Sequence, residues 1–154
     1  MQTALFQFQR RQLEVIARVT PHSMAGHILN TTVFAVAVAG SIPAGQLIPW
    51  CIYSYTIALI VLYRHMRSRG RVPRNFQRAT RRATIYAILL ALPWSFMTLM
   101  HWGELARDHE VILLALVAGM AASGTILLSA IPIAALNYMS GILIPSAVKS
   151  VLFI

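Results

Sequence analysis

The chain has 154 residues, of which 58% are hydrophobic and only 11% are charged. Soluble domains carry about 25% charged residues, so this composition excludes a mostly water-exposed surface and indicates a membrane protein. The net charge of +9 would also suit a nucleic-acid-binding protein, but only one aromatic residue, Phe76, lies in the basic region. Base stacking requires more, so no nucleic-acid partner is predicted.

Residues 1–20 are predicted to form a basic amphipathic helix at the membrane interface. Leu13, Ile16 and their apolar neighbours alternate with Arg11, Glu14 and other polar residues. Such a helix can lie among lipid headgroups, with its arginines attracted to anionic lipid. The pair Thr20–Pro21 is expected to end it, because the residue before a proline is pushed away from the helical conformation.

The apolar runs that follow predict an all-α fold, a polytopic transmembrane bundle over residues 21–154. A helix needs about 20 mostly apolar residues to cross the hydrocarbon core. The last 44 residues are almost continuously apolar, which is too long for one span and suits two. The lipid bilayer is therefore the expected environment of five spans, at about 24–42, 47–63, 83–100, 110–131 and 135–154.

Prolines and aromatic residues refine these spans. Trp50 and Tyr63 fall near the two ends of the second span, where interfacial aromatic residues are expected. Pro93 lies inside the third span, where neighbouring groups are expected to satisfy the backbone carbonyl that a proline frees. Pro132 is expected to form a tight buried turn between the fourth and fifth spans, and Pro145 lies within the fifth. The prolines fit either hinges that transmit a signal or simple kinks.

The loop between the second and third spans determines the predicted topology, because it is basic and contains no acidic residue. Basic residues in short loops favour the cytoplasmic side. Residues 101–110 hold three of the four acidic residues and are expected outside. The N-terminus is then cytoplasmic. The arginines that anchor this topology are Arg64, Arg67, Arg69, Arg71, Arg74, Arg78, Arg81 and Arg82.

Counting spans from this loop leaves Ile154 outside the cytoplasm. The chain also stops within apolar sequence, without a polar tail or a closing interface. We therefore expect these residues to be part of a longer protein, or at least one more span to follow.

Side chains suited to chemistry are few. Gly119, Ser123 and Gly124 predict close helix packing, either within the chain or at the seam of a homodimer. His27, Asn30 and Lys149 are polar residues inside predicted spans, where such residues usually face the bundle interior. Lys149 fits a functional charge or a side chain that reaches an interface. His27 fits a proton sensor or, more simply, a hydrogen-bonded structural histidine. No metal or other cofactor is predicted, because the outer-loop ligand types match no strong motif: His101, Glu104, Asp108 and His109.

One further pattern extends over nearly the whole chain. A proline and small residues open the first span, which contains an asparagine, and Pro–x₃–Leu–x₂–Trp opens the second. An arginine-rich loop and a mid-helix tryptophan precede Gly-Met-Ala-Ala-Ser-Gly, Leu-Ser-Ala and Pro-x-Ala-Ala. This pattern resembles the N-terminal multi-span sensor region of bacterial cyclic-di-GMP signalling proteins with GGDEF or GGDEF–EAL output domains. Its residues are Pro21, Ser23, Gly26, Asn30, Pro43, Leu47, Trp50, Trp94, 119–124, 128–130, Pro132, Ala134 and Ala135.

The resemblance implies a sensory module in a bacterial inner membrane. It would relay a signal to a cytoplasmic output domain through a shift in helix packing or dimer arrangement. The chain itself lacks GGDEF, EAL and kinase motifs, so it is not predicted to be an enzyme. Two alternatives remain open. A small transporter or channel subunit would have a polar path and internal repeats, and a membrane-embedded enzyme would cluster catalytic groups at one depth.

Overall fold

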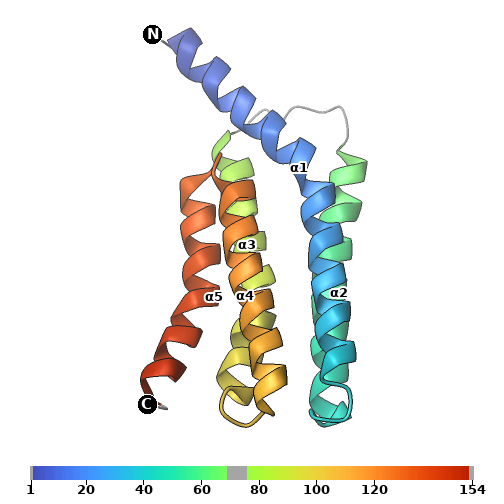
Figure 1. The fold of residues 1–154 in the computed structure, drawn as a ribbon. Helices are drawn as coiled ribbons and strands as arrows, with labels where there is room; N and C mark the ends of the chain where they lie inside the picture. The colour runs from blue at the N-terminus through green and yellow to red at the C-terminus, as the bar shows by residue number, and fades with distance from the viewer. Residues whose placement is uncertain (1, 69–75, 153–154) are drawn as a thin grey trace.

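The chain is a bundle of helices in the computed structural model, which describes residues 2–68 and 76–152 (Figure 1). No strand occurs among these residues, and an isolated bridge between Ala39 and Ile42 closes the first turn. The all-α prediction is therefore confirmed. The five helices of the described residues are α1 Gln2–Ala37, α2 Ala44–Arg67, α3 Phe76–His101, α4 Arg107–Leu128 and α5 Pro132–Leu152.

The helices fall into two packed units. α1 pairs with α2 as a hairpin, whereas α3 and α4 both pack against α5. The hairpin meets the three-helix unit where α1 contacts α4 and α2 contacts α3. Figure 1 shows the two units side by side, with the N-terminus at the end opposite the α1–α2 turn. This division into two units positions the candidate site.

The predicted break at Thr20–Pro21 is wrong, because α1 continues through Pro21. A proline inside a helix removes one backbone hydrogen bond and bends the helix, but the following turns can continue. The hydroxyl of Thr20 donates to the Ile16 carbonyl at 2.6 Å in the turn before it. Figure 1 shows α1 changing direction near this end of the bundle. The segment 1–20 and the first predicted span are thus parts of one helix.

The turn expected around Pro132 lies elsewhere, which corrects the predicted boundary. α4 ends at Leu128, and Pro132 is the first residue of α5. Proline suits this first position because its fixed φ matches a helix and its missing N–H would have no helical partner there. The connection is tightened by the amide of Ile131, which donates to the Leu128 carbonyl at 2.7 Å. Pro132 therefore starts a helix and is not the turn itself.

The backbone carbonyls that the prolines within α3 and α5 leave free accept hydrogen bonds from neighbouring helices. Pro93 frees the carbonyl of Leu89, four residues earlier, and the Tyr53 hydroxyl of α2 donates to that oxygen at 3.3 Å. Pro145 frees the carbonyl of Gly141, and the Ser95 hydroxyl of α3 donates to it. This arrangement is what a proline in an apolar helix requires. It joins α2 to α3 and α3 to α5 at defined heights, so these prolines lie at fixed helix junctions.

The Ser95 junction yields a prediction. Ser95→Ala is expected to lower the free energy of unfolding by about 0.6–1.7 kcal/mol, the range for hydrogen bonds between membrane helices. In a Pro145→Ala background the loss should vanish, because the introduced alanine restores the N–H that the Gly141 carbonyl lacks. Denaturant unfolding of the four proteins in detergent micelles measures the cycle. Equal losses in both backgrounds would contradict the role given to Pro145.

Trp50 is packed inside the bundle. Its side chain is 4% exposed, and its indole N–H donates to the Pro93 carbonyl at 2.7 Å. A buried indole N–H usually finds such a partner, and here the partner is on α3. The predicted depth of Trp50 near an interface stays a prediction. Tyr63, at the other end of α2, is 57% exposed. Trp50 thus belongs to the core.

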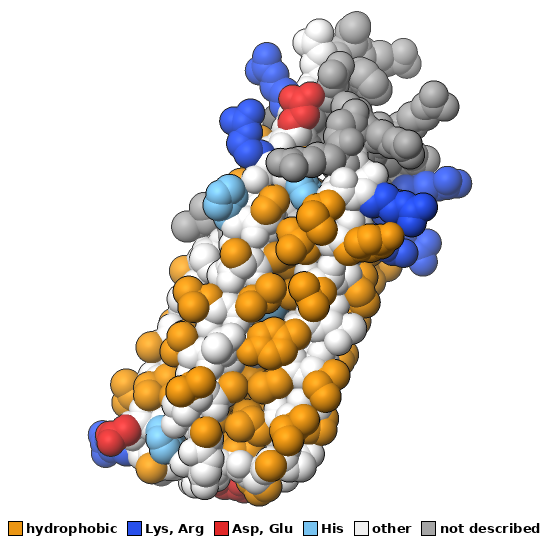
Figure 2. All heavy atoms as spheres, turned by 90° about the vertical axis from the view of Figure 1, so that its right-hand side faces the viewer, with side chains coloured by type: hydrophobic (Ala, Val, Ile, Leu, Met, Phe, Trp, Pro, Cys, Tyr) orange, Lys and Arg blue, Asp and Glu red, His pale blue; other side chains and the backbone are white. Residues whose placement is uncertain are grey.

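Apolar surface remains uncovered on the outside of the bundle. Among the described residues, α2 and α3 are long and apolar enough to cross a membrane, and their most apolar windows are only 22% and 39% buried. A core helix of a soluble protein would be mostly covered. Figure 2 shows hydrophobic side chains across the middle of one face, with Lys and Arg gathered toward one end. The finding supports membrane association through two helices, fewer than the five predicted spans.

Candidate functional site

A cleft of about 1440 Å³ lies between the hairpin and the three-helix unit. All five helices contribute to its lining, from the bend of α1 and the ends of α2 and α3 to the facing turns of α4 and α5. We call this space the interhelix cleft and define it by its lining residues. They include Arg18, His22, His27, Asn30, Val61, Arg64, His65, Arg67, Arg78, Arg82, Tyr86, Ala87, Leu90, Met120, Ser123, Gly124 and Tyr138.

Basic side chains form the mouth of the cleft. Five arginines line it, against a single acidic residue, Glu14. They come from α1, from the last turn of α2 and from the first two turns of α3, so helix ends distant in sequence meet here. The Arg64 guanidinium donates to the Tyr86 hydroxyl at 2.5 Å, which links α2 to α3 across the mouth. The mouth therefore favours a negatively charged group.

Below the mouth the walls are mostly apolar. Val61, Ala87, Leu90 and Met120 line this part, and each is at most 9% exposed. These four side chains come from α2, α3 and α4. Such walls suit hydrocarbon, because they offer no hydrogen bond to a polar guest.

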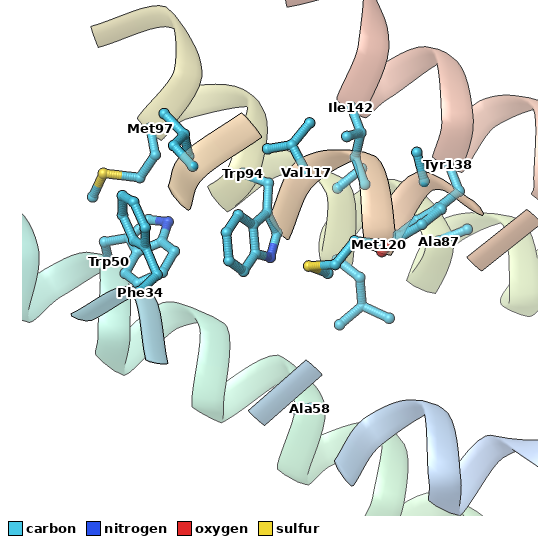
Figure 3. Packing of buried hydrophobic residues seen from close by; sticks show 14 of the residues in the cluster. Phe34, Trp50, Ala58, Ala87, Trp94, Met97, Val117, Met120, Tyr138 and Ile142 are labelled. Carbon is cyan, nitrogen blue, oxygen red and sulfur yellow. The ribbon is translucent and has the colours of Figure 1, made fainter. Parts of the chain in front are cut away.

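Aromatic rings pack beside the cleft and are not part of its lining. The Trp94 ring centroid lies 5.4 Å from that of Trp50 and 5.8 Å from that of Phe34. These three side chains are almost fully buried, and they bring α1, α2 and α3 together. Figure 3 shows Trp94 between the Phe34–Trp50 pair and the Val117–Met120 group. We call Phe34, Trp50 and Trp94 the aromatic cluster.

His27 lies between the cleft and the aromatic cluster. Its side chain is 4% exposed and lines the cleft, with its ring 6.4 Å from that of Trp94 in an edge-on arrangement. The Nε2 atom is buried and has no hydrogen-bond partner within the described residues. The prediction of a hydrogen-bonded structural histidine thus fails for this atom. A buried polar atom without a partner is costly, which makes His27 a candidate for contact with a ligand.

No protein-family model matches this sequence, and no curated protein or solved structure is significantly similar to it. The resemblance to cyclic-di-GMP sensor regions consequently stays a prediction. The cleft and its residues carry the functional argument.

The predicted small-residue patch is divided between two environments. Gly124 is buried on the side facing α5, where an added Cβ would overlap the Tyr138 ring. Gly119 is exposed, and an added Cβ would meet nothing within 4 Å. Ser123 lines the cleft, and its hydroxyl donates to the Met120 carbonyl of its own helix. Only Gly124 therefore takes part in close packing within the chain.

The remaining predicted residues are spread over the bundle. Asn30 lines the cleft one helical turn beyond His27. Lys149 lies in the last turn of α5, which favours the alternative of a side chain that reaches an interface. Pro145 is buried within α5, and Pro132 starts that helix. The structure thus brings His27 and Asn30 to one site and leaves Lys149 elsewhere.

The outer connection between α3 and α4 has its own contacts. His101 Nδ1 lies 3.9 Å from the Glu104 carboxylate, and the Gly103 amide donates to Glu110 at 2.6 Å. The hydroxyl of Ser41 lies 3.2 Å from His109 Nδ1, which ties the α1–α2 turn to this connection. Within the described residues, no three His, Cys, Asp or Glu side chains are placed to hold a metal ion.

Sequence reasoning did not single out Tyr86, Tyr138 or Ser95 as site residues. Tyr86 binds Arg64 at the mouth, Tyr138 covers Gly124, and Ser95 binds the carbonyl that Pro145 frees. A proline four residues after a carbonyl signals a need for a donor, but it does not say which helix supplies it. Of the topology-anchoring arginines, Arg64, Arg67, Arg78 and Arg82 line the cleft, and Arg81 lies outside it. Arg69, Arg71 and Arg74 are not among the described residues.

Proposed function

We propose that this chain is a membrane-embedded sensory module of a bacterial signalling protein. It relays a signal to a cytoplasmic output domain outside these residues. The observation that carries the proposal is the interhelix cleft between two separately packed units. A guest that fills or leaves the cleft would change how the hairpin sits against α3, α4 and α5. Helix packings of this kind shift as whole elements, so a local event can reach the ends of the helices.

The proposal includes five membrane spans. Each helix carries large apolar side chains that face away from the core, at 40% exposure or more. In water such surfaces would be a liability, whereas lipid covers them without cost. Examples, one for each helix in chain order, are Val36, Ile52, Leu92, Val111 and Ile144.

The basic end of the bundle is proposed to face the cytoplasm of a bacterial inner membrane. The arginines of α2 and α3 lie at the end where the N-terminal part of α1 also lies, and the α3–α4 connection with its acidic residues lies at the other end (Figure 1). This charge asymmetry follows the rule for short loops. Anionic lipid headgroups at the cytoplasmic face would attract the same side chains.

The output is proposed to be a diguanylate cyclase or a phosphodiesterase, from the resemblance to cyclic-di-GMP sensor regions. Catalysis is assigned to that domain, because the sequence of this chain carries no GGDEF, EAL or kinase motif. A homodimer is included in the proposal. Ala115, Ala118, Gly119 and Ala122 are exposed along α4, and small residues let a second helix approach closely.

The aromatic cluster favours sensing over transport. A channel or transporter subunit needs a polar path through the membrane, whereas the buried rings of Phe34, Trp50 and Trp94 pack together between α1, α2 and α3 beside the cleft. His27 and Asn30 line the cleft, where a ligand can bind and dissociate.

The test locks the two units together and measures the output. In a Cys51→Ala background, Arg64→Cys and Tyr86→Cys are joined across the mouth with a short bismaleimide. The control pair, Ala91→Cys with Gly141→Cys, joins α3 to α5 inside one unit, where the two Cβ atoms would lie 3.0 Å apart. Cyclic-di-GMP production by the native full-length product in membranes should change at least several-fold in the first pair and stay unchanged in the control.

An unchanged output in the mouth pair would contradict the relay. A native product limited to these residues, with no output protein copurifying, would favour a transporter or channel subunit instead. The same cells report the orientation. Ser68→Cys should be protected from an impermeant maleimide in intact cells, whereas Glu104→Cys should react.

A further inference from the structure

The interhelix cleft combines three features that rarely coincide by packing alone. Its mouth is basic, its walls are apolar, and its lining includes a buried histidine nitrogen without a partner among the described residues. We propose that the cleft binds one anionic glycerophospholipid, with the phosphate at the mouth and an acyl chain along the walls. This inference rests on the proposed function only in taking the cleft as the sensory site.

The charge at the mouth selects the headgroup. Arg64, Arg67 and Arg82 converge from two helices, and Glu14 is the single acidic residue of the lining. Guanidinium groups bind phosphate oxygens through paired N–H donors, which favours phosphate over a neutral headgroup. Basic pockets between membrane helices on the cytoplasmic side are a recognised form of anionic lipid site.

The apolar walls of the cleft favour a ligand with an acyl chain. Val61, Leu90 and Met120 supply apolar surface directly below the arginines. The volume of about 1440 Å³ exceeds the roughly 300–1,000 Å³ of sites for drug-sized molecules, so a lipid-sized guest fits it better than a free phosphate does. A free phosphate would leave the whole apolar part empty.

His27 accounts for the polar middle of such a lipid. It lies five residues beyond His22 along α1, which places it roughly 7 Å deeper at 1.5 Å per residue. The ester groups of a glycerophospholipid lie between phosphate and hydrocarbon. An ester carbonyl there accepts a hydrogen bond from His27 Nε2 when that nitrogen carries the proton. The atom that has no partner within the described residues thus gains one.

The experiment uses the full chain purified in detergent, with native mass spectrometry to count bound lipid. The probes are phosphatidylglycerol, phosphatidylcholine with the same chains, and inorganic phosphate alone. We expect one phosphatidylglycerol to be retained at least ten-fold more strongly than phosphatidylcholine. Inorganic phosphate should neither bind nor compete at millimolar concentration. Equal retention of both lipids, or competition by phosphate alone, would overturn the proposal.

Two adjacent arginines provide the matched variants. Arg82 lines the cleft, whereas Arg81 does not. Arg82→Gln should weaken phosphatidylglycerol retention about five-fold, the effect of one basic residue near an anionic lipid. Arg81→Gln should leave retention unchanged. Equal losses of retention in the two variants would show that the lipid is attracted to the basic surface in general, and would contradict a site in the cleft.

His27 is tested in the same assay. His27→Phe keeps a ring against Trp94 but removes the donor, and it should reduce retention several-fold. His27→Gln restores a donor and should recover most of it. Helical content measured by circular dichroism checks that each variant folds, and equal retention in His27→Phe and the native protein would contradict the ester contact. If the protein retains the lipid but cross-linking of the mouth pair leaves the output unchanged, the relay is contradicted and the lipid site is not.

Discussion

Replacement of Trp94 by alanine is expected to lower the free energy of unfolding by about 3 kcal/mol, the lower end of the range for tryptophan removed from a packed core. Trp94 is fully buried and contacts the rings of Phe34, Trp50 and His27. Helices in lipid associate through packing, since lipid tails are as apolar as the core. The loss therefore comes from the contacts around the cavity that the ring leaves.

Trp102 provides the control for this prediction. It is a half-buried tryptophan in the connection between α3 and α4, so Trp102→Ala should cost less than about 1 kcal/mol. Unfolding in detergent micelles, followed by the helical circular dichroism signal, compares the two variants without relying on tryptophan fluorescence. Similar costs at both positions would mean that the aromatic cluster does not hold the two units together.

Two glycines of α4 are expected to respond in opposite ways to the same substitution. Gly124→Ala should destabilise the protein by about 1–3 kcal/mol, the usual cost of inserting atoms into a packed core. The added Cβ would overlap the Tyr138 ring, which is itself 5% exposed and must move. Gly119→Ala adds its methyl group to open space and should be neutral or slightly stabilising.

A second variant identifies the clashing partner. In a Tyr138→Ala background the cost of Gly124→Ala should largely disappear, because the ring that the Cβ meets is gone. Thermal unfolding of the single and double variants in one detergent gives the comparison. If Gly124→Ala destabilises the Tyr138→Ala protein as much as the native one, the clash is with another residue. The close contact between Gly124 of α4 and Tyr138 of α5 would then be contradicted.

Local features of the sequence were sufficient to predict several parts of the fold. Apolar runs of helical length predicted an all-helical protein, and the arginines before and after the loop at 69–75 lie together at one end. Pro93 called for an outside donor to a freed carbonyl, and Tyr53 is that donor. In each case the expectation itself follows from a short-range rule or from composition, although the helix that supplies the donor was not predictable.

Other elements depended on neighbours that the sequence does not specify. α1 continues through Pro21, where a local rule predicted that the helix would end. Trp50 is buried between helices, where the Pro93 carbonyl accepts its N–H. Its position near the start of a span did not predict this tertiary partner.

The sequence by itself determined the helices, the basic and acidic ends and the residue types able to meet at a site. Only the tertiary structure decided which of them meet: His27 with Trp94, Gly124 with Tyr138, Ser95 with Gly141. The physical reason is the apolar character of both faces of these helices. In a soluble protein the polar face of a helix marks its exposed side. Where lipid and core are equally apolar, that signal is absent, and packing alone selects the contacts.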